Sequence, residues 1–130
     1  MSRYVPYHAE AAAKARELCK GEKDLLAKYG AVTRWVQKNV VYDYIRAVTI
    51  PKRGQYPDVD RCWKQHMGIC MDVASMTTGM LRAVGVNAYM CYGHADRAYH
   101  AWVEAHIGGK IYRFDHSGHA RKYRREKVFS

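Results

Sequence analysis

The sequence predicts a single α+β domain, residues 1–130, in which helices come first and antiparallel strands come last. Apolar residues recur at helical spacing up to about residue 85, whereas short alternating segments follow it. A pair of glycines between two of these segments is typical of a two-residue hairpin turn. With 130 residues, 48% of them hydrophobic, the chain is long enough to bury one core.

Two helices are predicted in the first third of the chain. Residues 8–20 are rich in alanine, the strongest helix former, and Gly21 separates them from a second helix over residues 23–40. One face of the second helix carries an apolar stripe made of Leu25, Tyr29, Val32, Val36 and Val40.

The middle of the chain is predicted to be less regular. Residues 41–50 are β-branched and aromatic, which favours a strand or an extended segment. Residues 51–60 contain two prolines and a glycine, and this composition predicts a loop. A loop at this point could line a substrate groove.

Cys70 stands at the start of a helix predicted over residues 70–84. Gly68 allows a tight entry, Asp72 in the first turn suits the helix dipole, and Gly85 ends the helix. The dipole and the free N–H groups at this end favour a thiolate, and the backbone N–H of Cys70 is free to donate to an oxyanion. Considered alone, a cysteine on an apolar helix is more often a small buried hydrophobic residue.

Strands are predicted after this helix at residues 86–92, 99–107 and 110–115. The Gly108-Gly109 pair is expected to join the last two strands into a hairpin. Ile107 then pairs with Lys110, and Glu104 lies opposite Arg113. Opposite charges facing each other across the strands favour this register.

The same register brings an imidazole and a carboxylate to one face of the hairpin. Because side chains alternate along a strand, His100, Trp102 and Asp115 share that face. Asp115 is then the diagonal neighbour of His100, roughly 7–8 Å away at the backbone, so its carboxylate can accept a hydrogen bond from the imidazole. The opposite face is apolar and is predicted to contact the core through Tyr99, Ala101, Val103, Ala105, Ile107, Tyr112 and Phe114.

A thiol, an imidazole and a carboxylate are the groups needed for acyl transfer through a thioester. Their local patterns together resemble the transglutaminase-like superfamily, whose members share a papain-like core. The resemblance covers residues 10–116 and is carried by G-x-C-x-D-x-A at 68–74, R-A-x-G at 82–85, H-A-W-x-E at 100–104, F-D at 114–115 and the upstream Y-D at 42–43.

The resemblance implies a role for each of the three residues. Cys70 would be the nucleophile, His100 the general base and acid, and Asp115 the carboxylate that orients the imidazole. It also implies a papain-like, transglutaminase-like core. In that core, N-terminal helices and a catalytic cysteine at a helix N-terminus pack on an antiparallel sheet that carries the histidine and the aspartate.

Members of the superfamily complete the oxyanion hole with a side chain whose position varies. The oxyanion or substrate-contact candidates in this chain are Gln65, Trp63, Tyr44 and Trp102. Gln65 lies five residues before the thiol and could supply an amide N–H. It is also compatible with an ordinary surface position on a polar helix.

The cysteines predict neither a disulfide framework nor a metal site. With Cys70 as nucleophile, Cys19, Cys62 and Cys91 remain, which is an odd number and contains no CxxC motif, so the sequence is compatible with at most one bridge among them. Cys62, His66 and Cys70 are four residues apart, but Gly68 interrupts the helix that would align them, and no fourth ligand has the spacing of a zinc site. We expect no metal and no cofactor.

The net charge of +10 divides into +6 over residues 1–120 and +4 over residues 121–127, which hold five basic residues and one acidic residue. We predict that residues 117–130 form a basic C-terminal tail. No nucleic-acid motif accompanies the charge, so we expect a solvated basic face that could attract an acidic peptide or protein substrate.

Membrane and secretion signals are not visible in the sequence. No run of 18 apolar residues predicts a membrane span, and the N-terminus lacks the apolar region of a signal peptide. This favours a cytoplasmic location.

The predicted activity is acyl transfer from a peptide or glutamine-type amide, most simply as a cysteine peptidase or amidase. A protein-glutamine cross-linking transglutaminase and a catalytically silent binding module of the same fold are the alternatives. Reactivity of the Cys70 thiol would separate the enzymes from the silent module.

Overall fold

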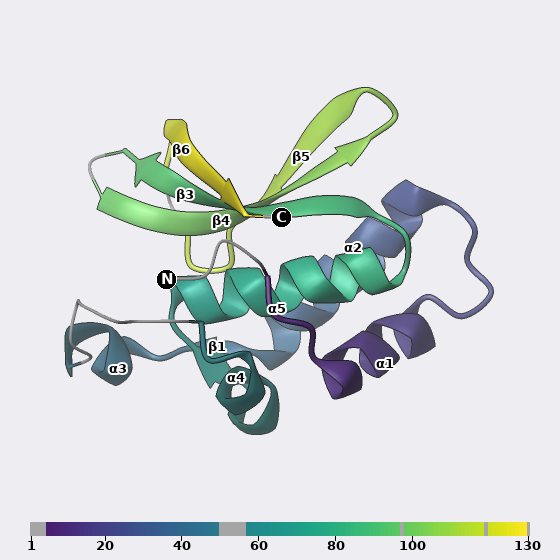
Figure 1. The fold of residues 1–130 in the computed structure, drawn as a ribbon, viewed down its shortest axis with the longest axis horizontal. Coiled ribbons are helices and arrows are strands. Elements are labelled where there is room, and N and C mark those ends of the chain that lie inside the picture. The colour runs from purple at the N-terminus through teal and green to yellow at the C-terminus, as the bar shows by residue number, and fades with distance from the viewer. Residues whose placement is uncertain (1–4, 50–56, 97, 119, 130) are drawn as a thin grey trace.

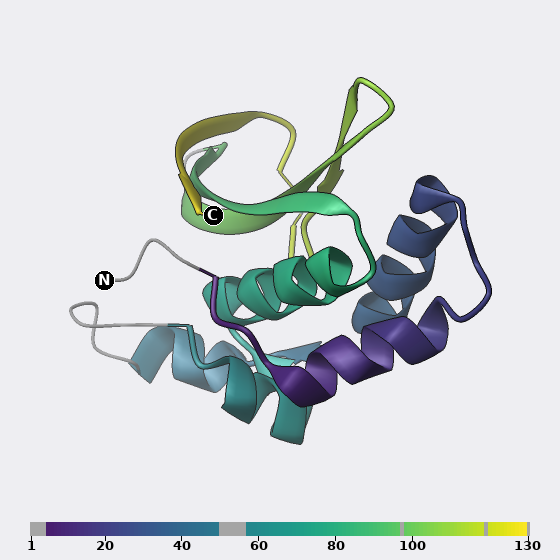
Figure 2. The same cartoon turned by 45° about the vertical axis from the view of Figure 1, so that its right-hand side comes forward.

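The computed structural model describes residues 5–49, 57–96, 98–118 and 120–129. Helices pack beneath one face of a four-stranded antiparallel sheet, which confirms the predicted α+β class (Figure 1). The sheet is strongly curled, and both of its edges bend away from the helices (Figure 2).

The two N-terminal helices begin where a side chain caps their first turn. Helix α1 is Ala9–Leu18, and the His8 ring accepts a hydrogen bond from the N–H of Ala11 at 3.2 Å. Helix α2 is Leu25–Asn39, and the Asp24 carboxylate accepts from the N–H of Ala27 at 2.9 Å. Each cap satisfies a backbone donor that the helix itself leaves free. Both helices match the predicted segments.

Residues 41–50 were predicted as a strand or extended segment, and this is wrong for most of their described part. Strand β1 is only Val41–Tyr42, and helix α3 is Tyr44–Thr49. The residue between them explains the change, because the Asp43 carboxylate caps the helix by accepting from the N–H of Arg46 at 3.0 Å. A local side-chain cap therefore overrides the weak β preference of the segment.

Helix α4, Val59–Gln65, begins inside the segment predicted as a loop, and residues 51–56 of that prediction lie outside the described residues. Asp58 caps α4, and His66 ends it with a φ of 52°. Strand β2, Met67–Gly68, then pairs with β1 in parallel. Because α4 ends before His66, the side chains of Cys62, His66 and Cys70 do not share one helix.

Helix α5, Cys70–Ala83, is the centre of the fold and contacts α1, α2, α4 and the strands β3 and β4. Most of its residues are buried. Its core neighbours include Val32 and Val36 of α2 together with Val86, Met90 and Val103 near or on the sheet. The predicted helix boundary at Gly85 is confirmed, and that glycine has a φ of 88°.

The sheet has the order β5-β4-β3-β6. Its strands are β3 Asn87–Ala95, β4 Ala98–Ile107, β5 Lys110–Phe114 and β6 Tyr123–Phe129. The hairpin register is confirmed, since Ile107 pairs with Lys110 and Glu104 with Arg113 around two glycines of positive φ.

The apolar face of the hairpin is confirmed only in part. Ala101, Val103 and Ala105 face the helical core, as expected. Tyr99 instead lies exposed and packs its ring against that of Tyr92 at 4.4 Å.

The end of the chain differs from the predicted tail. Residues 123–129 form β6, which pairs antiparallel with β3 and buries Phe129. The strands approach so closely that a Cβ at Gly93 would overlap the main-chain oxygen of Arg124, and the register shifts at this glycine.

Within the described residues, no helix is long and apolar enough to span a membrane.

We predict that Gly93→Ala lowers the free energy of unfolding by about 2 kcal/mol, because the added methyl group forces β6 away from β3. Gly79→Ala is the matched control. A Cβ there would meet only the Pro6 oxygen at 3.6 Å, so we expect stabilisation by about 1 kcal/mol from helix propensity. Urea unfolding of both variants tests the pair. Equal effects at the two positions would contradict the close β3–β6 approach.

Candidate active site

Cys70 is the first residue of α5 and lies half-buried at its N-terminus. The preceding turn needs a glycine, because a Cβ at Gly68 would come within 2.8 Å of the Asp72 side chain and 3.0 Å of the Cys62 sulfur. The first turn of a helix leaves its N–H groups without intrahelical partners. Those donors and the helix dipole favour negative charge on the Cys70 sulfur and on an adjacent oxyanion.

Asp72 holds the entrance of this helix in place. Its side chain is only 1% exposed and accepts from the N–H of Ile69 at 3.0 Å, from the N–H of Asp58 at 2.8 Å and from the Arg46 guanidinium. Burial raises the pKa of Asp72, and these donors oppose the shift. One buried carboxylate therefore ties α3 and the start of α4 to the residue before Cys70.

The parallel pairing of β1 with β2 brings Tyr42 opposite Gly68, two residues before the thiol. Burial raises the pKa of Tyr42, and the side chain and backbone N–H of Cys70 both act on its hydroxyl. A hydroxyl and an amide N–H that lie close together can both donate to one oxygen placed beside them, which is the arrangement of an oxyanion hole. Tyr42 was not among the oxyanion candidates predicted from the sequence. The Y-D pattern at 42–43 was the available signal.

His100 lies on β4 between the thiol and a carboxylate. Its Nε2 is 2.8 Å from Oδ1 of Asp115, and the ring lies close enough to Cys70 for the two side chains to interact. Burial alone would lower the pKa of His100, but the bonds from Asp115 and Cys70 outweigh it and raise that pKa to about 10. The imidazole is therefore protonated at neutral pH beside the sulfur.

Asp115 follows the last residue of β5 and is 7% exposed at its side chain. Burial alone would raise its pKa, but hydrogen bonds from His100, from the Tyr123 hydroxyl and from the Ser117 amide hold the pKa below its usual range. Gly118 makes room for the carboxylate, because a Cβ there would overlap Oδ2 of Asp115.

The structure therefore brings Cys70, His100 and Asp115 together. A family model of the transglutaminase-like superfamily matches residues 12–116, which is most of the chain. The chain belongs to the transglutaminase-like superfamily. Among curated proteins, no sequence matches it significantly.

Solved structures share the transglutaminase-like fold with this chain. A candidate cysteine protease from Cytophaga hutchinsonii has a TM-score of 0.70 at 24% identity, with 92% of this chain and 40% of that one aligned. The periplasmic domain of TgpA from Pseudomonas aeruginosa has a TM-score of 0.63 at 21% identity, with 88% and 45% aligned. A TGase has a TM-score of 0.63 at 17% identity, with 90% and 32% aligned. The chain thus spans less than half the length of each.

The remaining candidate residues of this transglutaminase-like domain take different places. Tyr44 is 74% exposed, and its ring packs against that of Tyr42 at 4.8 Å. Gln65 is exposed at the end of α4, and no hydrogen bond within the described part of the chain joins it to Cys70.

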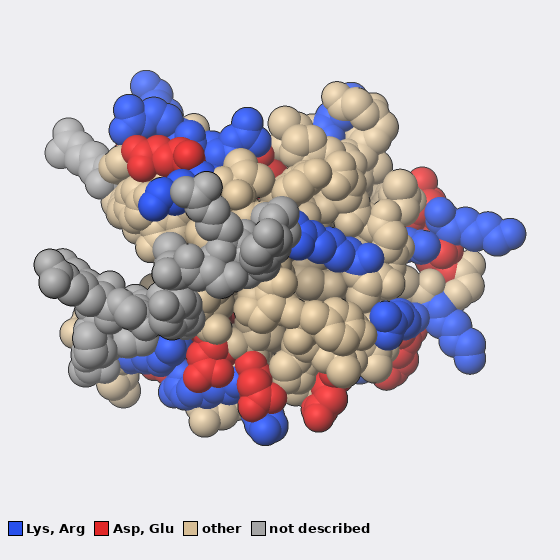
Figure 3. Space-filling view, in the orientation of Figure 1, with Lys and Arg blue, Asp and Glu red and all other residues tan. Residues whose placement is uncertain are grey.

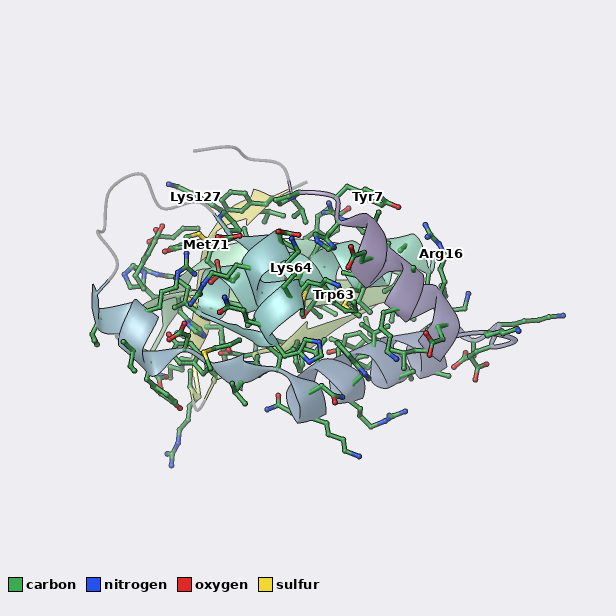
Figure 4. The ribbon with its side chains drawn as sticks, turned by 90° about the horizontal axis from the view of Figure 1, so that it is seen from below. Tyr7, Arg16, Trp63, Lys64, Met71 and Lys127 are labelled. Carbon is green, nitrogen blue, oxygen red and sulfur yellow. The ribbon has the colours of Figure 1, made fainter. Side chains whose placement is uncertain are left out.

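The two tryptophan candidates have their indole N–H groups occupied elsewhere. Trp63 donates to Glu10 of α1 at 2.8 Å and, seen from the side opposite the sheet, lies against α1 (Figure 4). The structure therefore does not bring Trp63 to the thiol. Trp102 is buried and donates to Glu104 at 2.9 Å, so its N–H is not available to an oxyanion.

The prediction that Glu104 forms an opposite-charge pair with Arg113 is wrong. The two residues face each other as predicted, but the Glu104 carboxylate pairs with Arg125 of β6 at 3.0 Å. The Arg113 guanidinium instead lies over the Tyr123 ring at 3.9 Å. Strand β6 was not part of the predicted sheet, so this competition could not be foreseen.

All four cysteines are free, and Cys19, Cys62 and Cys91 are buried. Burial raises the pKa of Cys62 and of Cys91 to about 12 and also raises that of Cys19. Among the described residues, no three His, Cys, Asp or Glu side chains are grouped so as to hold a metal ion.

We predict that iodoacetamide at pH 6.5 modifies Cys70 at least about tenfold faster than the other three cysteines in the folded protein. The protonated His100 and the helix N-terminus stabilise negative charge at Cys70, whereas the three buried thiols are held in their protonated form. Peptide mapping by mass spectrometry after brief labelling gives the four rates. The contradicting result would be four equal rates in the native protein that match the rates measured in urea. Cys70 would then not be assigned as the nucleophile.

Proposed function

We propose that this transglutaminase-like domain is a thiol-dependent acyl-transfer enzyme that acts on a peptide or glutamine-type amide. The observation that carries the proposal is the contact of His100 with both Cys70 and Asp115 at the N-terminus of α5. A buried, charged imidazole between a sulfur and a carboxylate is unfavourable for stability alone and is typical of catalytic sites.

In the proposed reaction, the Cys70 thiolate attacks the amide carbonyl carbon. The N–H of Cys70 and the Tyr42 hydroxyl donate to the resulting oxyanion. The C–N bond then breaks as the His100 imidazolium transfers its proton to the leaving amine, and a thioester remains on Cys70. Water attacks the thioester while His100 accepts one of its protons. The C–S bond breaks, which releases the carboxylic acid and restores the thiolate.

Hydrolysis is the preferred outcome, and the fold relative described as a candidate cysteine protease supports it. A primary amine in place of water would give a cross-linking reaction by the same steps. Incubation of a peptide library in ¹⁸O water with a labelled amine separates the two. Incorporation of ¹⁸O into new carboxyl termini supports the peptidase, and amine incorporation at glutamine contradicts it.

An acidic peptide or protein is the preferred substrate class. Exposed basic residues of the C-terminal segment, including Arg121, Arg124 and Lys127, gather over the end of the sheet that carries β6 (Figure 3). A positive surface raises the local concentration of acidic substrates, and added salt weakens the effect. Enrichment of Asp and Glu among cleaved library peptides at low salt, lost at high salt, is the expected result.

We predict graded losses from substitutions in the triad. Cys70→Ala abolishes labelling by an activity probe, because the thioester cannot form. His100→Ala reduces turnover by about 10³-fold, because both proton transfers are lost. Asp115→Asn causes a smaller loss, because it disturbs only the orientation of the imidazole. Thermal melts run beside the assays should remain close to wild type. A Cys70→Ala protein that melts far below the parent, or an Asp115→Asn protein that labels like wild type, would overturn these roles.

We further predict that Tyr42→Phe lowers kcat by about 10²-fold through loss of one oxyanion donor, with little change in KM. Tyr44→Phe is the matched control, because it removes a hydroxyl from the adjacent, exposed ring. Steady-state kinetics on a cleaved library peptide compare the two. Equal values for the two variants would exclude Tyr42 from the oxyanion hole.

A further inference from the structure

Strand β6 places one of its side chains on the carboxylate of the triad. The Tyr123 hydroxyl donates to Oδ2 of Asp115 at 2.8 Å. Tyr123 lies beyond residue 116, where the match to the superfamily model ends. The contact therefore comes from a part of the chain that the family pattern does not cover.

We propose that Tyr123 is a positioning residue that fixes the Asp115 carboxylate for His100. The inference rests on the proposed function of the triad and adds a further residue to it. Tyr123 does not touch the reacting atoms and acts only through Asp115.

The geometry accounts for both oxygens of the carboxylate. Oδ1 of Asp115 is 2.8 Å from Nε2 of His100, and Oδ2 is 2.8 Å from the Tyr123 hydroxyl. Because Asp115 is almost fully buried, water does not replace either partner well. With one oxygen held on each side, the carboxylate cannot rotate away from the imidazole.

Tyr123 is itself held from several directions. The Arg113 guanidinium lies 3.9 Å above its ring, and the Trp102 ring packs edge-on at 5.0 Å. Its backbone pairs with Ala95 of β3. Just before it, the N–H groups of residues 121 and 122 donate to the Asp96 carboxylate at 2.9–3.2 Å. A hydroxyl on so constrained a ring has little freedom, which suits a positioning role.

The charges around the pair agree with this role. Burial and the bond to Asp115 raise the pKa of Tyr123 to about 12, so the hydroxyl stays a donor at working pH. The same bond helps to hold the pKa of Asp115 low. Titratable and charged groups from several elements face the pair. They are Cys70 of α5, Asp96 in the turn after β3, His100 and Glu104 of β4, Arg113 of β5 and Arg125 of β6.

The test measures the rate of Cys70 alkylation by iodoacetamide from pH 5 to pH 9, so it needs no substrate. In Tyr123→Phe the buried Asp115 loses a donor, its pKa rises, and it protonates at a higher pH. The acid limb of Cys70 reactivity should therefore move to higher pH, and the loss relative to wild type should grow as pH falls, reaching about tenfold at pH 5. Tyr112→Phe is the control, because this tyrosine of β5 packs its ring on Tyr29 of helix α2. The control should keep the wild-type profile.

A double-mutant cycle separates positioning from a general structural effect. If Tyr123 acts through Asp115, Tyr123→Phe should cause no further loss in an Asp115→Asn background. Additive losses would overturn the proposal. Should Tyr123→Phe fail to fold, 3-fluorotyrosine at position 123 supplies a stronger donor and should move the acid limb to lower pH. If the acid limb of Cys70 reactivity stays at the wild-type pH in the 3-fluorotyrosine protein, the proposal is also overturned.

The outcomes distinguish this inference from the function on which it rests. A wild-type Cys70 that reacts no faster than the other cysteines would overturn the proposed function and the inference with it. A reactive wild-type Cys70 with an identical profile in Tyr123→Phe would overturn the inference alone.

Discussion

The burial of α5 is the constraint on which the rest of the structure depends. Helices contact it on one side and the strands β3 and β4 on the other, so it has almost no freedom to rotate or slide. Its first residue is Cys70, and the thiol is therefore presented at a defined place beneath the edge of the sheet. The hydrophobic effect that stabilises the domain thus also sets the position of the candidate nucleophile.

Buried charges refine the position that packing has established. Asp72, Asp43 and Glu104 are all buried acidic residues, and each is paired with an arginine from another element. Removing one partner of such a pair costs more than the pair itself contributes, because an uncompensated charge remains in the interior. These pairs therefore hold α3, α4 and β6 in one arrangement around the site rather than adding much net stability.

The curl of the sheet brings residues of β6 to the candidate active site. Both β5 and β6 rise on the side of the sheet away from the helices, and side chains of β6 reach β4 and the end of β5 although the strand pairs with β3 (Figure 2). Arg125 then binds Glu104, and Tyr123 reaches Asp115. A flat sheet of the same strand order would leave these side chains apart.

The sequence by itself determined the parts of this protein that depend on local rules. Helical periodicity and the glycine entry put Cys70 at a helix start, and the two-glycine turn set the register that brings His100 near Asp115. Only the tertiary structure decided the rest. Tyr42 meets Cys70 through a parallel pairing of strands 26 residues apart, and Tyr123 meets Asp115 through the curl of the sheet. Such contacts depend on how elements pack together, and no short pattern along the chain encodes that packing.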